Sequence, residues 1–143
     1  MVANCNGLRE TTGMARVILR ILLAIFYFGA GVLHLTSPEG FLRITPDWVP
    51  FAPQVVALTG IAEITGAIGL MLPRFRRAAG IGLALYALCV WPANFNHAFN
   101  NIAIGGSDLS WWYHGPRLAL QPVLIWLALW VGEGTDWPFR KSA

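Results

Sequence analysis

The stretch TGIAEITGAIGLML, residues 59–72, is apolar enough to lie in lipid, yet it carries one carboxylate, Glu63. Small and polar residues recur there every three or four positions, as they do along one face of a helix. They are Thr59, Gly60, Glu63, Gly66, Ala67 and Leu70, and the opposite face carries Leu58, Ile61, Ile68 and Met71. Small residues let membrane helices approach closely, whereas bulky aliphatic residues suit lipid. We therefore expect a membrane helix with Glu63 on its packed face.

The composition of the whole chain also indicates a membrane protein. Of its 143 residues, 56% are hydrophobic and only 12% are charged, and the mean hydropathy is +0.56. A soluble domain carries about 25% charged residues. The length indicates one domain. Cys5 and Cys89 form no C-x-x-C pair, so the sequence gives no support to a dithiol or a zinc site.

Four apolar runs are candidates for membrane helices, because a bilayer core of about 30 Å needs about 20 helical residues. They lie at about residues 15–35, 53–72, 78–98 and 117–132. None alternates strictly between apolar and polar residues, so we expect helices rather than strands. The predicted fold is an all-α, four-helix transmembrane bundle at residues 15–132. A flexible tail at 1–14, with Met14 as a second candidate start, and a tail at 133–143 flank it. Gly80 and Gly82 are predicted to pack against the helix before them.

The basic residues predict the orientation of this bundle. Eight of the ten Lys and Arg lie near the termini or in the short link at residues 73–77, and the other two are Arg43 and Arg117. The positive-inside rule then places both termini in the cytoplasm of a multi-pass membrane protein. The loops at about 36–52 and 99–116 face outward, with Trp48, Trp111 and a solvated His114. Because the arginines are split among short segments, we expect membrane lipid rather than nucleic acid as the partner.

Polar residues gather in the predicted outer half of the bundle. The outer helix ends carry His34, Asn94, His97, Arg117 and Gln121. Asn94 and Gln121 are expected about one turn deeper than the others, and Glu63 about ten residues below Pro53, which is about 15 Å at about 1.5 Å per residue. Ionisable residues inside a membrane usually mark function, so we predict that Glu63 handles a proton or binds a ligand. The other five are predicted to bind the ligand. The alternative is structural: Glu63, Asn94 and Gln121 would bond neighbouring helices, and the rest would be interfacial side chains.

We expect neither haem nor a metal in this cavity. His34 and His97 could ligate haem, but their surroundings are small and polar, whereas haem needs bulky apolar space. His34, Glu63 and His97 have suitable ligand types for a divalent metal. The depth difference between Glu63 and the two histidines argues against that site.

Four segments together resemble the DoxX-like small bacterial membrane proteins, over about residues 15–132. They are GAGVLHLTSPEGFLRITPDWVP (29–50), LTGIAEITGAIGLMLPRFRRAAGIGL (58–83), WPANFNHAF (91–99) and RLALQPVLIWLALW (117–130). The resemblance implies a four-helix membrane protein of a family named after a small subunit of a thiosulfate:quinone oxidoreductase. The positions that match are His34, Glu63, Asn94, Arg117 and Gln121. The chain lacks the paired cysteines of a thiol-redox relative.

Taken together, these features predict a redox-associated membrane subunit that binds a small lipid-soluble ligand, such as a quinone, in a polar cavity of the outer half. If the protein takes part in catalysis, we expect a subunit of a quinone-linked oxidoreductase with other redox subunits as partners. One alternative is a membrane scaffold or assembly factor. The third is a small transporter, which would need a polar path through the inner half, and the sequence offers little there.

Overall fold

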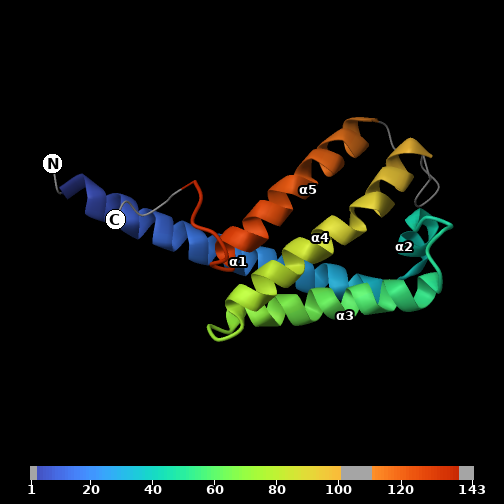
Figure 1. Cartoon of the computed structure of the whole chain (residues 1–143), viewed down its shortest axis with the longest axis horizontal. Coiled ribbons are helices and arrows are strands. Elements are labelled where there is room, and N and C mark those ends of the chain that lie inside the picture. Colours follow the sequence, from blue (N-terminus) through green and yellow to red (C-terminus); the bar gives the residue numbers. More distant parts are fainter. Residues whose placement is uncertain (1–2, 101–110, 139–143) are drawn as a thin grey trace.

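The computed structural model describes residues 3–100 and 111–138, with side chains from residue 12 onward. Within these ranges the chain is helical and has no strand, which confirms the all-α prediction. Four long helices and one short helix follow one another along the chain (Figure 1). They are α1 (Ala3–Thr36), α2 (Glu39–Ile44), α3 (Ala52–Met71), α4 (Arg76–Phe99) and α5 (Trp111–Val131).

The long helices form two closely packed pairs, α1 with α3 and α4 with α5, and a tight turn joins α3 to α4 (Figure 1). We call the end of the bundle with this turn and both chain ends the inner end. From there the two pairs diverge toward the outer end, where α2 contacts both α3 and α4 (Figure 1). The bundle is therefore closed at its inner end and spread at its outer end.

Three helices are long and apolar enough to cross a membrane: Thr12–Thr36 within α1, Ala52–Met71 and Arg76–Phe99. α5 has 21 residues but is not among them, because its polar and aromatic residues lower its mean hydropathy. The chain thus has the helices of a multi-pass membrane protein, and their exposed apolar faces suit contact with lipid. The fourth membrane span stays a prediction.

Three segments differ from their predicted boundaries. α1 begins at Ala3 instead of about residue 15, because no proline interrupts the first fourteen residues and the helix continues beyond the apolar run. The predicted outer loop at 36–52 contains α2. α5 begins at Trp111 instead of about residue 117, and the ring of Trp111 meets that of Phe99 in α4. This contact between helices extends α5 beyond its apolar run.

The two predicted faces of α3 are confirmed. The buried residues include Gly60, Glu63, Ala67 and Leu70, whereas Leu58, Ile61, Ile68 and Met71 are exposed. α1 has a similar buried stripe, formed by Arg20, Leu23, Ala24 and Tyr27 at spacings of three and four. Both stripes face the centre of the bundle, so the acid of α3 and the arginine of α1 are both turned away from lipid.

Glycines make the closest contacts between helices. A β-carbon at Gly31 in α1 would lie 2.6 Å from the carbonyl oxygen of Gly60 in α3. A β-carbon at Gly80 in α4 would lie 2.8 Å from Cα of Gly132, just after α5. Gly80 thus packs against the end of α5 rather than against α3, and Gly82 faces open space, so the predicted packing of both against the preceding helix is wrong. Residues two positions apart on a helix point to nearly opposite sides. Of Gly80 and Gly82, only Gly80 therefore faces a neighbouring helix.

We predict that Gly80→Ala lowers the free energy of unfolding by about 1–3 kcal/mol, as overpacking of a tight contact does. The new methyl group would meet the Ala128 carbonyl oxygen at 2.6 Å as well as Gly132. Backbone atoms cannot rotate away as a side chain can. Gly82→Ala is the matched control and should leave stability unchanged or slightly higher, since alanine favours helices. Thermal unfolding of the detergent-solubilised variants checks this, and equal midpoints would contradict it.

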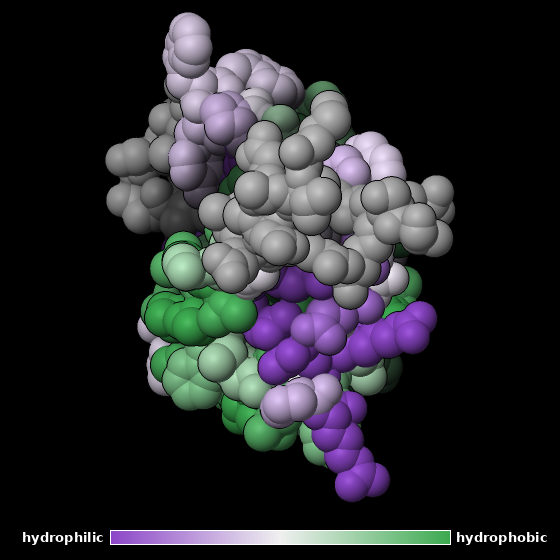
Figure 2. Space-filling view, turned by 90° about the vertical axis from the view of Figure 1, so that its left-hand side faces the viewer, coloured by the Kyte–Doolittle hydropathy of each residue, from purple (hydrophilic) through white to green (hydrophobic). Residues whose placement is uncertain are grey.

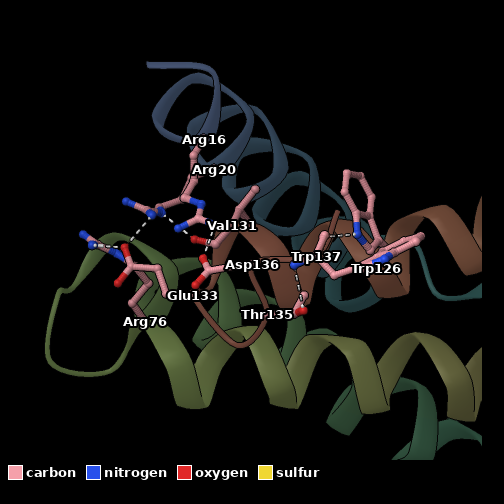
Figure 3. Close-up of polar contacts among 9 residues, drawn as sticks. All are labelled: Arg16, Arg20, Arg76, Trp126, Val131, Glu133, Thr135, Asp136 and Trp137. Atoms are coloured by element: carbon pink, nitrogen blue, oxygen red, sulfur yellow. Dashed lines mark hydrogen bonds and ion pairs between the residues drawn. The ribbon is translucent and has the colours of Figure 1, made fainter. Parts of the chain in front are cut away.

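An ionic cluster holds the segment after α5 against the middle of α1 and the beginning of α4 (Figure 3). Oε1 of Glu133 accepts hydrogen bonds from Arg20 of α1 and Arg76 of α4, both at 2.9 Å. Arg20 also donates to the Val131 carbonyl at 2.8 Å. That carbonyl lies at the C-terminus of α5, where the last carbonyls have no partner within the helix. One buried arginine therefore caps one helix and ties it to another.

A second ion pair extends this cluster along the folded-back segment. Arg16 donates to Asp136 at 2.8 Å, and its guanidinium carbon lies 4.9 Å from the centroid of the Trp130 ring. The indole of Trp126 donates to the Trp137 carbonyl at 3.1 Å (Figure 3). Figure 2 views the inner end and shows hydrophilic surface gathered there between hydrophobic flanks. The residues after Val131, expected as a tail, are therefore packed onto the bundle as far as Trp137.

We predict that Glu133→Gln destabilises the protein by about 1.5–3 kcal/mol, the usual contribution of a hydrogen bond to a charged group. The loss is large because Arg20, which is only 6% exposed, would lose its counter-charge away from water. Asp136→Asn is the control: its ion pair is more exposed, and such pairs contribute about 0–1 kcal/mol. Unfolding midpoints in detergent measure both changes. If Glu133→Gln lowers the unfolding midpoint no more than Asp136→Asn does, the stabilising role of Glu133 in the ionic cluster is wrong.

Candidate functional site

A cavity of about 370 Å³ lies in the outer half of the bundle, where the two helix pairs diverge. All five helices contribute to its wall, which consists mainly of aliphatic and aromatic side chains. It is lined by five of the six residues predicted to form the site, namely His34, Glu63, Asn94, Arg117 and Gln121. The structure therefore brings together residues that are up to 87 positions apart in the sequence.

Glu63 is the centre of the polar groups in this cavity and is only 3% exposed. The hydroxyl of Tyr86 in α4 donates to its Oε1 atom at 2.8 Å. On the other side, Nδ1 of His34 in α1 lies 2.9 Å from its Oε2 atom. The carboxyl group thus contacts two other helices: Oε1 accepts a hydrogen bond, whereas Oε2 is buried beside His34 without a hydrogen bond.

The hydrogen bonding of His34 determines which of its ring nitrogens is left for a ligand. Nδ1 lies 2.9 Å from the Ala30 carbonyl, with the geometry of a hydrogen bond. A carbonyl oxygen only accepts, so Nδ1 carries a hydrogen, and its contact with Glu63 is one of distance alone. The ring stacks on Phe41 of α2, with centroids 3.6 Å apart. Since His34 lines the cavity, Nε2 is the nitrogen available there.

The predicted depth difference between His34 and Glu63 is wrong, because the two side chains are in contact. His34 is two residues from the end of α1, whereas Glu63 is eleven residues inside α3. α1 therefore ends lower in the bundle than α3 begins, and α2 lies beyond its end (Figure 1). The crossing of the two helices at Gly31 and Gly60 sets this offset. Helix lengths alone do not reveal it.

The sequence argument against a metal site relied on a difference in depth between Glu63 and the histidines. Because His34 contacts Glu63, that argument does not hold for His34. His34 and Glu63 are adjacent, but His97 lies with Arg117 on the other helix pair. In the ranges that the structure describes, no group of three or more His, Cys, Asp or Glu side chains is arranged to hold a metal ion.

Arg117 lines the cavity from α5, and His97 of α4 holds it. Nη1 of Arg117 contacts Nδ1 of His97. Arginine has no acceptor, so Nδ1 must accept this bond and carries no hydrogen. His97 is fully buried and does not line the cavity. Its contact is therefore with Arg117, and it acts as a positioning residue rather than as the direct ligand contact that we predicted.

His114 is buried, so the prediction that it is solvated is wrong. Because α5 begins at Trp111, His114 lies inside the helix, and its ring meets that of His97 edge-on with centroids 4.7 Å apart. Tyr113 packs its ring against His97 as well, at 6.2 Å. These aromatic contacts support the histidine that holds Arg117.

Asn94 and Gln121 form a polar link between α4 and α5. The amide nitrogen of Asn94 donates to the side-chain oxygen of Gln121 at 3.2 Å, and Gln121 donates in turn to the Ala87 carbonyl. Gln121 is therefore bound at both ends and buried. Asn94 keeps its own oxygen as an acceptor on the cavity wall. The two residues thus form the hydrogen bond between helices that the structural alternative predicted, and both also line the cavity.

Sequence reasoning missed Tyr86, although the turn between α3 and α4 contains the signal. Across a tight turn, contacts between two antiparallel helices step outward by three or four residues on each helix. A β-carbon at Gly69 would meet Ala79, and one at Gly66 would meet Leu83. The next step along this series pairs Glu63 with Tyr86. Extrapolation from the turn would therefore have identified the tyrosine as the partner of the acid.

The arrangement suits a ligand that is mostly apolar but has polar atoms at two places. The first polar region is formed by His34, Glu63 and Tyr86, and the second by Asn94, Arg117 and Gln121. The first belongs to α1, α3 and α4, and the second to α4 and α5. Ligand pockets of this kind have a largely apolar wall and a few fixed polar groups that orient the ligand.

Comparison with known protein families matches residues 23–132 to a family described as a domain of unknown function, DUF8561. The matched segment runs from the middle of α1 to the end of α5 and includes every residue that lines the cavity. Among curated proteins and solved structures, no match was found. Since the match covers more than half of the sequence, the chain belongs to the DUF8561 family.

Proposed function

We propose that this protein crosses a bacterial inner membrane four times and binds a small lipid-soluble ligand in the cavity of its outer half. A quinone is the class of ligand that we favour, with the protein as a redox-associated membrane subunit. The observation that carries the proposal is a largely apolar cavity with polar groups fixed at two places. A quinone ring has the same pattern, because it is apolar apart from oxygen atoms on its edge.

The polar groups would bind the two sides of such a head group. Nε2 of His34 is the ring nitrogen available to one oxygen of the head group. In a neutral imidazole it accepts a hydrogen bond from a hydroxyl, and in an imidazolium it donates one to a carbonyl. Arg117 keeps further N–H donors beyond the one that contacts His97, and these suit a second oxygen.

The proposed orientation has both termini in the cytoplasm, and two observations support it. Both described chain ends lie at the inner end of the bundle, as an even number of spans requires (Figure 1). The same end carries Arg16 and Arg20 near one terminus, and Arg74, Arg76 and Arg77 in the turn between α3 and α4. This asymmetry agrees with the positive-inside rule. Membership of the DoxX-like family stays a prediction.

A membrane scaffold or assembly factor is the second candidate, and the exposed apolar faces of the helices favour it. The lipid side of α4, which includes the exposed Leu85 and Leu88, would bind partner proteins. Gly82→Trp tests this face, because Gly82 faces open space and the bundle should tolerate the change. Loss of a co-purifying membrane protein in this variant would support the scaffold. A transporter has no such support, since Leu70, Leu83 and Val131 close the inner half with apolar side chains.

We predict that Glu63→Gln weakens the binding of decylubiquinone at least tenfold, which corresponds to about 1.4 kcal/mol. The substitution keeps the size of the side chain but replaces the carboxyl group, whose Oε2 atom lies 2.9 Å from Nδ1 of His34, with an amide. Quenching of tryptophan fluorescence measures binding to the purified protein in lipid nanodiscs, because Trp48 lines the cavity.

Glu39→Gln is the matched control for this experiment. It makes the same chemical change at an exposed position in α2, outside the cavity, and should bind like the wild type. Saturable binding of equal strength in wild type and Glu63→Gln would exclude the assigned role of the acid. If the wild type shows no saturable quenching, the quinone proposal is wrong and the scaffold becomes the leading candidate.

A further inference from the structure

We propose that the ligand enters the cavity sideways from the lipid, between α1 and α5, and that it carries an apolar tail that stays in this opening. The head group would lie among the polar residues and the tail would extend into the bilayer. This inference rests on the proposed function, because it specifies the shape of the ligand bound in the same cavity.

The first observation is that α1 and α5 contact each other near the inner end. Arg20 of α1 bonds the Val131 carbonyl at 2.8 Å, and Arg16 lies over Trp130 at 4.9 Å. From this crossing α5 rises away from α1 toward the outer end (Figure 1). The hydrogen bonds of α5 in the outer half are made to α4 instead, through Gln121 and Arg117. The α1–α5 side of the cavity therefore lacks the close helix packing of the other sides.

The second observation is the character of the side chains at this opening. Phe26 of α1 and Leu120 of α5 both line the cavity, yet they remain 52% and 48% exposed. Phe26 is two residues from the middle of the candidate span Thr12–Thr36, so in the proposed membrane orientation the opening would lie at the depth of the lipid hydrocarbon. Both side chains are apolar, and the lipid at that depth is hydrocarbon. Only a hydrophobic molecule would pass there.

The outer end of the cavity is covered by other parts of the chain. α2 contacts α3 and α4, and the Ile44 carbonyl accepts a hydrogen bond from Asn96 of α4 at 3.0 Å. Phe41 stacks on His34, which closes the same side above the polar groups. Ile44, Pro46 and Val49 line the cavity from this cover. The cover after α2 thus lies over the outer end of the cavity, whereas the α1–α5 side presents the apolar and half-exposed Phe26 and Leu120.

The size of the cavity leads to the inferred tail. Its volume of about 370 Å³ is near the lower end of the range of roughly 300–1,000 Å³ for pockets that enclose a small molecule. A head group with one aromatic ring fits within it. A long hydrocarbon or isoprenoid chain does not fit as well, so it would have to leave through the opening beside Leu120.

The experiment blocks the opening and compares two quinones with the same ring. Leu120→Trp adds bulk at the opening, and Val123→Trp is the matched control, because Val123 is also 48% exposed but does not line the cavity. Decylubiquinone has a ten-carbon tail, and 2,3-dimethoxy-5-methylbenzoquinone has none. Isothermal titration calorimetry of the full chain in lipid nanodiscs gives the dissociation constant of each quinone. Size-exclusion profiles confirm that both variants fold.

We expect Leu120→Trp to weaken decylubiquinone at least tenfold and to change the tail-less quinone less than twofold. Val123→Trp should bind both like the wild type. If Leu120→Trp weakens both quinones equally or neither, the lateral opening is wrong and the proposed cavity ligand stands. If the wild type binds neither quinone, the proposed function fails first, and this inference fails with it.

Discussion

The close crossing of α1 and α3 at Gly31 and Gly60 is the constraint on which the rest of the site depends. Because neither residue has a side chain, the two backbones approach to a distance that a β-carbon would prevent. This crossing brings His34 against Glu63, although the two lie at different distances from the ends of their helices. A bulkier residue at either glycine would force the two backbones apart at the crossing that brings the acid and the imidazole together.

The inner and outer halves of the bundle place charge in opposite ways. At the inner end, Arg20 and Arg76 share Glu133, and this ionic cluster fastens α1, α4 and the segment after α5. In the outer half, Glu63 meets a histidine and a tyrosine, and Arg117 meets a histidine. Ion pairs between fully charged side chains thus close the inner end. In the outer half, the charged residues instead meet histidine and tyrosine side chains, and Arg117 keeps further N–H donors.

Much of the fold could be predicted from the sequence, because it follows from local periodicity. The apolar runs predicted the four long helices, and the spacing of small and bulky residues predicted both faces of α3. The helix ends were less accurate, since contacts between helices extend α5 to Trp111 and bury His114. The prediction for Gly82 was wrong for a related reason, because local spacing does not reveal which side of a helix meets a neighbour. Its spacing from neighbouring small residues resembled a packing motif, but its direction on α4 is toward lipid.

The sequence by itself determined which residues are costly to place in a membrane, and therefore which would need partners: Glu63, His34 and Arg117. Arg20 counted there only as an orientation signal. Only the tertiary structure decided which partner each one has. Tyr86 and His34 meet Glu63, His97 meets Arg117, and Glu133 meets Arg20. The physical reason is that composition and periodicity act along one helix. The pairing of side chains depends on the offset and the crossing of two helices, and the backbone contacts at glycines set both.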